Sequence, residues 1–251
     1  MPMILSSPFK SFNVDSLSKR WAAILLILFV WGVSFWFQVA PPGDPDFSQM
    51  LYWYQDFAKA KDPYLFMDQH PFSTVFTASN ALYLFSAMFY GFFLFLCGQF
   101  YFVMYVCDLR KVPLSRAPSI FFTRVWWMIL FSVVFFVPVL FLVSILSYFV
   151  LLWIPAFYAM PGLVFFEKKD SFTASIKSFS KTRGHKFSIL IEITIISLLF
   201  FILSAIVQKI LNAGSLGLGL VQSFLISYFT LVMARNMGKR YHLITILPNL
   251  Y

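Results

Sequence analysis

The chain has 251 residues, of which 60% are hydrophobic and only 12% are charged. A soluble domain needs a charged surface built from about a quarter of its residues, so this composition rules out a soluble enzyme. The sequence runs apolar for whole stretches instead of alternating apolar and polar residues, which argues against a membrane barrel. We therefore expect an all-α polytopic membrane bundle that forms a single domain over residues 1–251.

Six transmembrane helices are predicted from the apolar runs. The first run, 21–39, holds 19 residues without a charge. Between residues 121 and 166 only Arg124 is charged, and this stretch is too long for one span, so we predict two helices joined by a turn near 144–148. The predicted spans cover about residues 21–39, 76–106, 125–146, 148–166, 187–207 and 216–235.

The basic residues are sorted to one side of this layout. If the N-terminus is cytoplasmic, sixteen of the nineteen Lys and Arg residues fall on the inner side, and only Lys59, Lys61 and Lys209 fall outside. The positive-inside rule predicts this asymmetry. We therefore expect a multi-pass protein of the bacterial inner membrane, with both termini in the cytoplasm.

The outer loop 40–74 carries five of the ten Asp and Glu residues. Within it Phe47, Leu51, Tyr54 and Ala58 recur at helical spacing, which predicts a short amphipathic helix. We interpret these acidic residues as a by-product of the topology: the basic residues are kept on the inner side, so acidic residues predominate in the outer loop. The alternative is that they attract cations to the mouth of a pore.

The inner segment 167–186 is expected to form an interfacial amphipathic helix, and the inner segment 107–124 a weaker version of it. Asp170 and Ser171 indicate the start of the first helix, and Gly184 indicates its end. Phe172, Ile176 and Phe179 share one face, and the basic residues beside it are Lys177, Lys181, Arg183 and Lys186. Such a helix anchors the topology and suits the anionic lipids of the cytoplasmic face. A membrane protein partner is the other occupant that we consider.

The same region resembles a known family. Residues 161–167 read PGLVFFE, and they are followed by ASIKSF at 174–179 and TRG at 182–184. This run resembles the signature of the YciC-like bacterial inner-membrane proteins, which recurs in the membrane domain of some glycerophosphodiester phosphodiesterases. The matching positions are Pro161, Glu167, Ser178 and Gly184. The resemblance implies a six-helix fold and an inner-membrane location, and it brings no catalytic residues.

Glu192 is the one carboxylate inside an apolar run, and it lies about one and a half turns past Lys186. An ionisable residue in a span is a functional candidate. Proton or cation handling is one interpretation, and the other is a structural pair with Arg183, Lys186 or a basic residue of a neighbouring helix. Pro155 and Pro161 are expected to kink the fourth helix, as a structural or a gating feature.

The remaining side chains argue against catalysis. His70, His185 and His242 lie far apart in the sequence, so no metal site is expected. Cys97 and Cys107 belong to one apolar run, where a helix keeps them too far apart for a disulfide. We therefore predict a non-catalytic accessory or interaction component of the envelope, with no cofactor and no nucleic-acid partner. The alternative is a small transporter or channel that uses the kinked fourth helix and Glu192.

Overall fold

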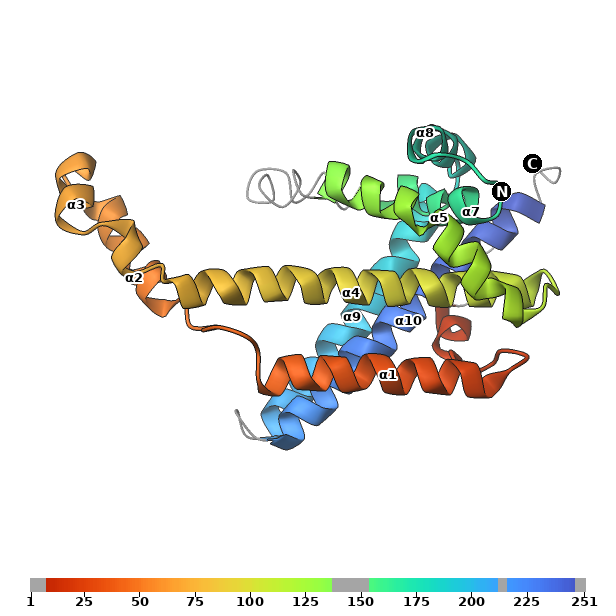
Figure 1. The fold of residues 1–251 in the computed structure, drawn as a ribbon, viewed down its shortest axis with the longest axis horizontal. Helices are drawn as coiled ribbons and strands as arrows, with labels where there is room; N and C mark the ends of the chain where they lie inside the picture. Colours follow the sequence, from red (N-terminus) through yellow and green to blue (C-terminus); the bar gives the residue numbers. More distant parts are fainter. Residues whose placement is uncertain (1–7, 137–153, 212–215, 247–251) are drawn as a thin grey trace.

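The computed structural model describes residues 8–136, 154–211 and 216–246, and every regular element in these ranges is a helix (Figure 1). The first elements are η1 (Pro8–Phe12), α1 (Arg20–Val39), α2 (Ser48–Lys59), α3 (Pro63–Gln69) and η2 (Phe72–Thr74). They are followed by α4 (Ala78–Leu109), η3 (Leu114–Arg116), α5 (Ala117–Phe131) and the π-helical turn η4 (Ser132–Phe136). The last elements are α7 (Met160–Phe165), α8 (Ser171–Lys181), α9 (Lys186–Ile210) and α10 (Leu216–Ile246). The predicted all-α fold is confirmed for the described residues.

Within the described ranges, five helices are long and apolar enough to cross a membrane. They cover Arg20–Val39, Ala78–Leu109, Leu114–Val134, Lys186–Ile210 and Leu216–Thr245. A shorter apolar helix, Ile154–Phe165, lies where the fourth span is predicted, whereas the predicted turn at 144–148 lies outside the described residues. The structure therefore supports a multi-pass membrane protein, and the six-span count stays a prediction.

Two helices extend beyond the bounds that hydropathy suggests. α5 begins at Ala117 rather than near 125, because Pro118 is well tolerated in the first turn of a helix. Residues 117–124 thus belong to the same helix as the start of the predicted third span. α10 runs to Ile246 rather than 235, since Lys and Arg end an apolar run without ending a helix.

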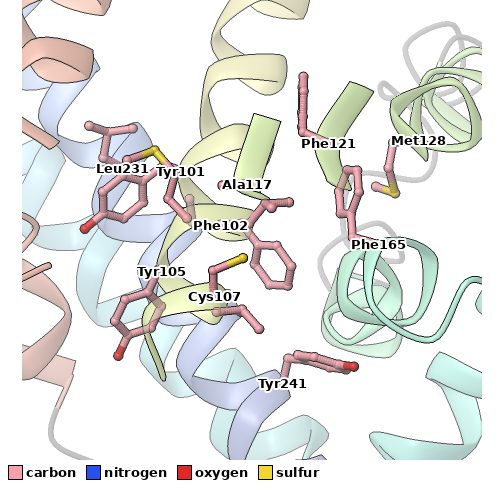
Figure 2. Packing of buried hydrophobic residues seen from close by; sticks show 14 of the residues in the cluster. Tyr101, Phe102, Tyr105, Cys107, Ala117, Phe121, Met128, Phe165, Leu231 and Tyr241 are labelled. Atoms are coloured by element: carbon pink, nitrogen blue, oxygen red, sulfur yellow. The ribbon is translucent and has the colours of Figure 1, made fainter. Parts of the chain in front are cut away.

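The core is built at one end of the bundle, around α10. This helix packs against α4, α1 and α9. The second half of α4 is buried from Cys97 to Cys107, apart from Phe100, which is partly buried. Figure 2 shows aromatic and aliphatic side chains of this cluster gathered between the helices, including Tyr101, Phe102, Leu231 and Tyr241.

The other halves of the long helices leave their apolar side chains uncovered. On α4, Phe85 and Phe89 expose 61% and 72% of their surface, and on α9, Phe201 and Ile210 expose 67% and 74%. Apolar surface of this extent is unfavourable in water and suits contact with lipid tails. The described bundle is therefore packed at one end and presents apolar surface along the rest of its length.

The two ends of the bundle carry different elements. The amphipathic helix predicted in the outer loop is present as α2, and its partly buried side chains are Met50, Trp53 and Phe57. Leu51 and Tyr54 of the predicted face are exposed. Trp53 packs on aromatic rings of α3 and η2. Figure 1 shows α2 and α3 at one end of α4, whereas residues 8–18, α8 and the last turns of α10 lie near the other end.

The variant Gly162→Ala tests this packing. A Cβ atom on Gly162 would overlap the ring of Tyr241, which is fully buried and accepts a 3.0 Å hydrogen bond from Arg110 Nη2. Overpacking of a core costs about 1–3 kcal/mol, so we expect a lower midpoint of thermal unfolding in detergent. Gly91→Ala is the matched control, because nothing lies within 4 Å of its Cβ position. Equal losses in the two variants would contradict the packing described here.

Candidate functional site

Glu192 lies in the second turn of α9 and is completely buried. Arg240 of α10 contacts this carboxylate through two nitrogen atoms of its guanidinium group, Nε and Nη2. Arg240 Nε donates to Glu192 Oε2 at 2.7 Å, and Arg240 Nη2 lies 2.7 Å from Glu192 Oε1. Arg240 is itself only 4% exposed. This fork geometry is the strongest form of an ion pair between a guanidinium and a carboxylate.

Further hydrogen bonds complete the pair. Asn236 Nδ2 donates to Glu192 Oε2 at 2.9 Å, and Tyr158 OH donates to Asn236 Oδ1 at 2.5 Å. Arg240 Nη2 also donates to Ser188 Oγ at 2.6 Å. Buried charges are tolerated when their remaining hydrogen-bonding positions are satisfied in this way. The network joins α9, α10 and the segment that precedes α7.

The sequence predicted that Glu192 has a basic partner but did not identify it. Arg183 is exposed, and the Lys186 ammonium lies 3.3 Å from the centre of the Phe179 ring. The partner is Arg240. The last span was predicted to end at residue 235, so Arg240 was not expected to lie on a helix. The spacing of Asn236 and Arg240, four residues apart on one helix face, is the signal that could have found it.

The helix that follows Ile154 is interrupted at 158–159 and restarts as α7, with Pro161 in its first turn. Pro161 has no N–H to donate to the carbonyl of Phe157, four residues earlier. The Ala156 carbonyl accepts hydrogen bonds from Ser178 Oγ at 2.7 Å and from Thr182 Oγ1 at 3.4 Å. The Ala156 carbonyl, just before the interruption, is thus a docking point for α8. A gating role for the two prolines stays a prediction.

α8 turns small residues toward the protein and large apolar residues away from it. Its buried side chains are Ser171, Ala174, Ser175 and Ser178. Its large apolar side chains expose 74% of Phe172, 58% of Ile176 and 58% of Phe179. The predicted apolar face is present, and it stays uncovered by the described part of the chain.

The predicted start of α8 is observed, whereas the helix ends at Lys181 with Thr182 as its C-cap, two residues before Gly184. Asp170 Oδ1 accepts a hydrogen bond from the Thr173 N–H at 2.9 Å, and this bond lowers the pKa of Asp170. Gly184 follows the helix with a φ of 85°, in the left-handed region that glycine adopts without strain. The boundaries of α8 are therefore fixed by local chemistry.

The four basic residues predicted to contact lipid are not equivalent. Lys181 Nζ lies 2.7 Å from Glu167 Oε1, which joins α8 to the chain that follows α7. The Lys186 ammonium makes a cation–π contact with the Phe179 ring, which is still 58% exposed. Lys177 and Arg183 are exposed. Among the predicted set, Lys177 and Arg183 are thus the residues best placed to meet an anion outside the protein.

The described residues hold no group of three or more His, Cys, Asp or Glu side chains that could bind a metal ion. Burial and the charge of Arg240 lower the pKa of His185, which favours the neutral form of this side chain. Cys97 and Cys107 are free and buried.

Comparison of the chain with protein families, curated proteins and solved structures finds no match of any kind. The resemblance of residues 161–184 to the YciC-like proteins therefore stays a prediction from those residues.

A double-mutant cycle tests the ion pair. Glu192→Leu and Arg240→Met each leave one buried charge without its partner, which costs about 3–5 kcal/mol in free energy of unfolding. The double variant should recover much of this loss, because neither charge remains. Chemical unfolding in detergent measures all three variants, with Lys181→Met, which removes a partly exposed pair, as the control for a small loss. Additive losses at positions 192 and 240 would contradict direct coupling.

The start of α8 is expected to depend on pH. Since the folded pKa of Asp170 lies below its ordinary value of 3.8, the cap stabilises the fold above that value and loses its effect as the pH falls through the folded pKa. Asp170→Asn keeps a capping oxygen without a titrating group. Limited proteolysis of α8 across acidic pH should show a pH-dependent rise in cleavage for the wild type and a flatter profile for the variant. Identical profiles would rule out the cap as the cause.

Proposed function

We propose that the protein is a non-catalytic, six-helix integral membrane protein of the bacterial inner membrane, with both termini in the cytoplasm. It acts as an accessory or interaction component, and α8 contacts anionic lipid on the cytoplasmic face. The observation that carries this proposal is the outward orientation of Phe172, Ile176 and Phe179, beside the exposed Lys177.

Membrane-surface helices have this composition. Apolar side chains of such a helix enter the boundary between headgroups and acyl chains, while basic side chains remain at the headgroup level. Phe187, which follows α8, is also 62% exposed and extends the apolar surface. Each basic residue near an anionic surface contributes about 1 kcal/mol, so Lys177 and Arg183 supply a preference for anionic lipid.

The state of Glu192 favours an accessory role over transport. Its two carboxylate oxygens are held by Arg240 and Asn236, and its side chain has no exposure. A transported cation would first have to displace Arg240 from a buried bidentate pair, which is strongly unfavourable. Glu192 is therefore best explained as a structural residue.

Site-selective quenching tests the lipid contact. A fluorophore on Ile176→Cys reports the environment of α8, because Ile176 is exposed while Cys97 and Cys107 are buried. In bilayers of phosphatidylcholine and phosphatidylglycerol, a nitroxide carried on the phosphatidylglycerol headgroup should quench the label more strongly than one on phosphatidylcholine. The variant Lys177→Glu/Arg183→Glu should bring the two quenching efficiencies close to equality.

The control for this experiment is Lys59→Glu. Lys59 is an exposed basic residue on α2, at the other end of the bundle, so its reversal should leave the preference at Ile176 unchanged. Quenching that is equal for both lipids in the wild type would refute the contact of α8 with anionic lipid. A membrane protein that co-purifies with the chain would then be the candidate partner of α8.

A further inference from the structure

Residues 8–18 fold back against the packed end of the bundle before α1 begins. η1 contacts α10 and α9. Ser11, Val14 and Leu17 are buried, with exposures of 0%, 3% and 7%. The backbone N–H of Ser18 donates to Asp108 Oδ1 at 3.0 Å, which ties the end of the segment to α4. We call residues 8–18 the N-terminal strap.

The strap covers four hydrogen-bond donors, which we call the donor cup: Tyr101, Tyr228, Arg235 and Asn236. The two tyrosine hydroxyls donate to the backbone carbonyls of Val14 and Phe12. Arg235 Nη2 donates to Ser16 Oγ at 2.6 Å, and Asn236 Nδ2 donates to Ser11 Oγ at 3.3 Å. In each of these four contacts the strap contributes an oxygen that accepts.

The charge at the centre of the donor cup is unbalanced. Arg235 is 7% exposed, and its guanidinium lies 4.4 Å from the centre of the Tyr105 ring. Its Nε atom has no hydrogen-bond partner within the described parts of the chain. Among the described residues, no carboxylate forms an ion pair with Arg235. The carboxylate of the strap, Asp15, pairs with Arg20 instead. Buried charges are normally paired, because an unpaired one is costly.

A carboxylate beside the donor cup is already paired. Asn236 also contacts Glu192, but Arg240 neutralises that carboxylate. The cup therefore combines one buried guanidinium, two phenolic hydroxyls and an amide group. Each of them donates to the strap, and the Tyr101 hydroxyl also accepts from Arg235 Nη1 at 3.4 Å. A guanidinium fork with added donors is the arrangement with which proteins bind phosphate groups.

We propose that the donor cup is a binding site for a phosphate group, and that the oxygens of the N-terminal strap occupy the site until such a group displaces them. The phosphate belongs to a lipid headgroup or to a soluble phosphate compound, since the cup recognises the chemistry that both share. This site is separate from the apolar face of α8 and does not depend on it.

Displacement of the strap is the direct readout. Phe9 is 67% exposed on the strap, so a fluorophore on Phe9→Cys in the full-length protein reports whether the strap is docked. In a neutral detergent, we expect inorganic phosphate or short-chain phosphatidylglycerol to change this signal in a saturable way, while chloride at the same ionic strength does not. A response to phosphate assigns a soluble ligand, and a response to phosphatidylglycerol alone assigns a lipid headgroup.

Three variants make the test specific. Ser16→Ala removes the hydrogen bond to Arg235, and because a bond to a charged group is worth about tenfold in an equilibrium, the apparent affinity for the probe should rise about tenfold. Ser16→Asp places a tethered carboxylate beside Arg235, and we expect it to lower the apparent affinity for the probe by about tenfold or more. Ser180→Ala, at an exposed position on α8, should leave it unchanged.

Two results would overturn the proposal. The first is the absence of a saturable response to either probe in both the wild type and Ser16→Ala. The second is a response of Ser16→Asp that equals that of the wild type. This variant keeps the buried Arg235, so the test does not depend on a substitution that could unfold the protein. The variant Lys177→Glu/Arg183→Glu should respond as the wild type does, so failure at the donor cup and failure of the α8 lipid contact are distinguishable.

Discussion

The packed end of the bundle depends on one interaction, the bidentate ion pair between Glu192 of α9 and Arg240 of α10. Removing two charges from water costs several kcal/mol for each, and only good geometry with additional hydrogen bonds offsets this cost. Ser188 and Asn236 provide those bonds, and Asn236 extends the network to Tyr158. The pair therefore fixes α9, α10 and the segment before α7 in one arrangement.

The membrane-facing features follow from that arrangement. Tyr158 lies where the helix before α7 is interrupted, and the Ala156 carbonyl beside it receives the hydroxyl of Ser178. α8 is consequently docked by its small residues, and this leaves Phe172 and Ile176 pointing outward. At the same end, Asn236 contacts Ser11, which places the N-terminal strap over Arg235.

Composition predicted the fold class because scarcity of charge and long apolar runs are properties of whole segments. Hydropathy predicted the end of α10 poorly, since it reports contact with lipid, whereas a helix continues through residues such as Lys239 and Arg240. Amphipathicity predicted α8, and Asp170 marked its start because a capping side chain acts locally. It did not indicate that the serine face docks, since periodicity alone does not say what covers each face.

The partners of Glu192 and Arg235 required the structure. Arg240 is distant from Glu192 in the sequence, and the strap that covers Arg235 has no periodic pattern of its own. Such contacts depend on how helices cross and on how the chain turns back before α1, and neither property is encoded in the residues of one segment.

Hydrogen–deuterium exchange of the wild type and Glu192→Gln in lipid nanodiscs tests the central claim most directly. If the ion pair holds the packed end together, the amides of the N-terminal strap, residues 154–165 and α8 lose protection together in the variant. α2 and α3, at the other end of α4, keep the exchange rates of the wild type. Loss of protection confined to the turn of α9 around residue 192, or unchanged exchange throughout, would contradict the account.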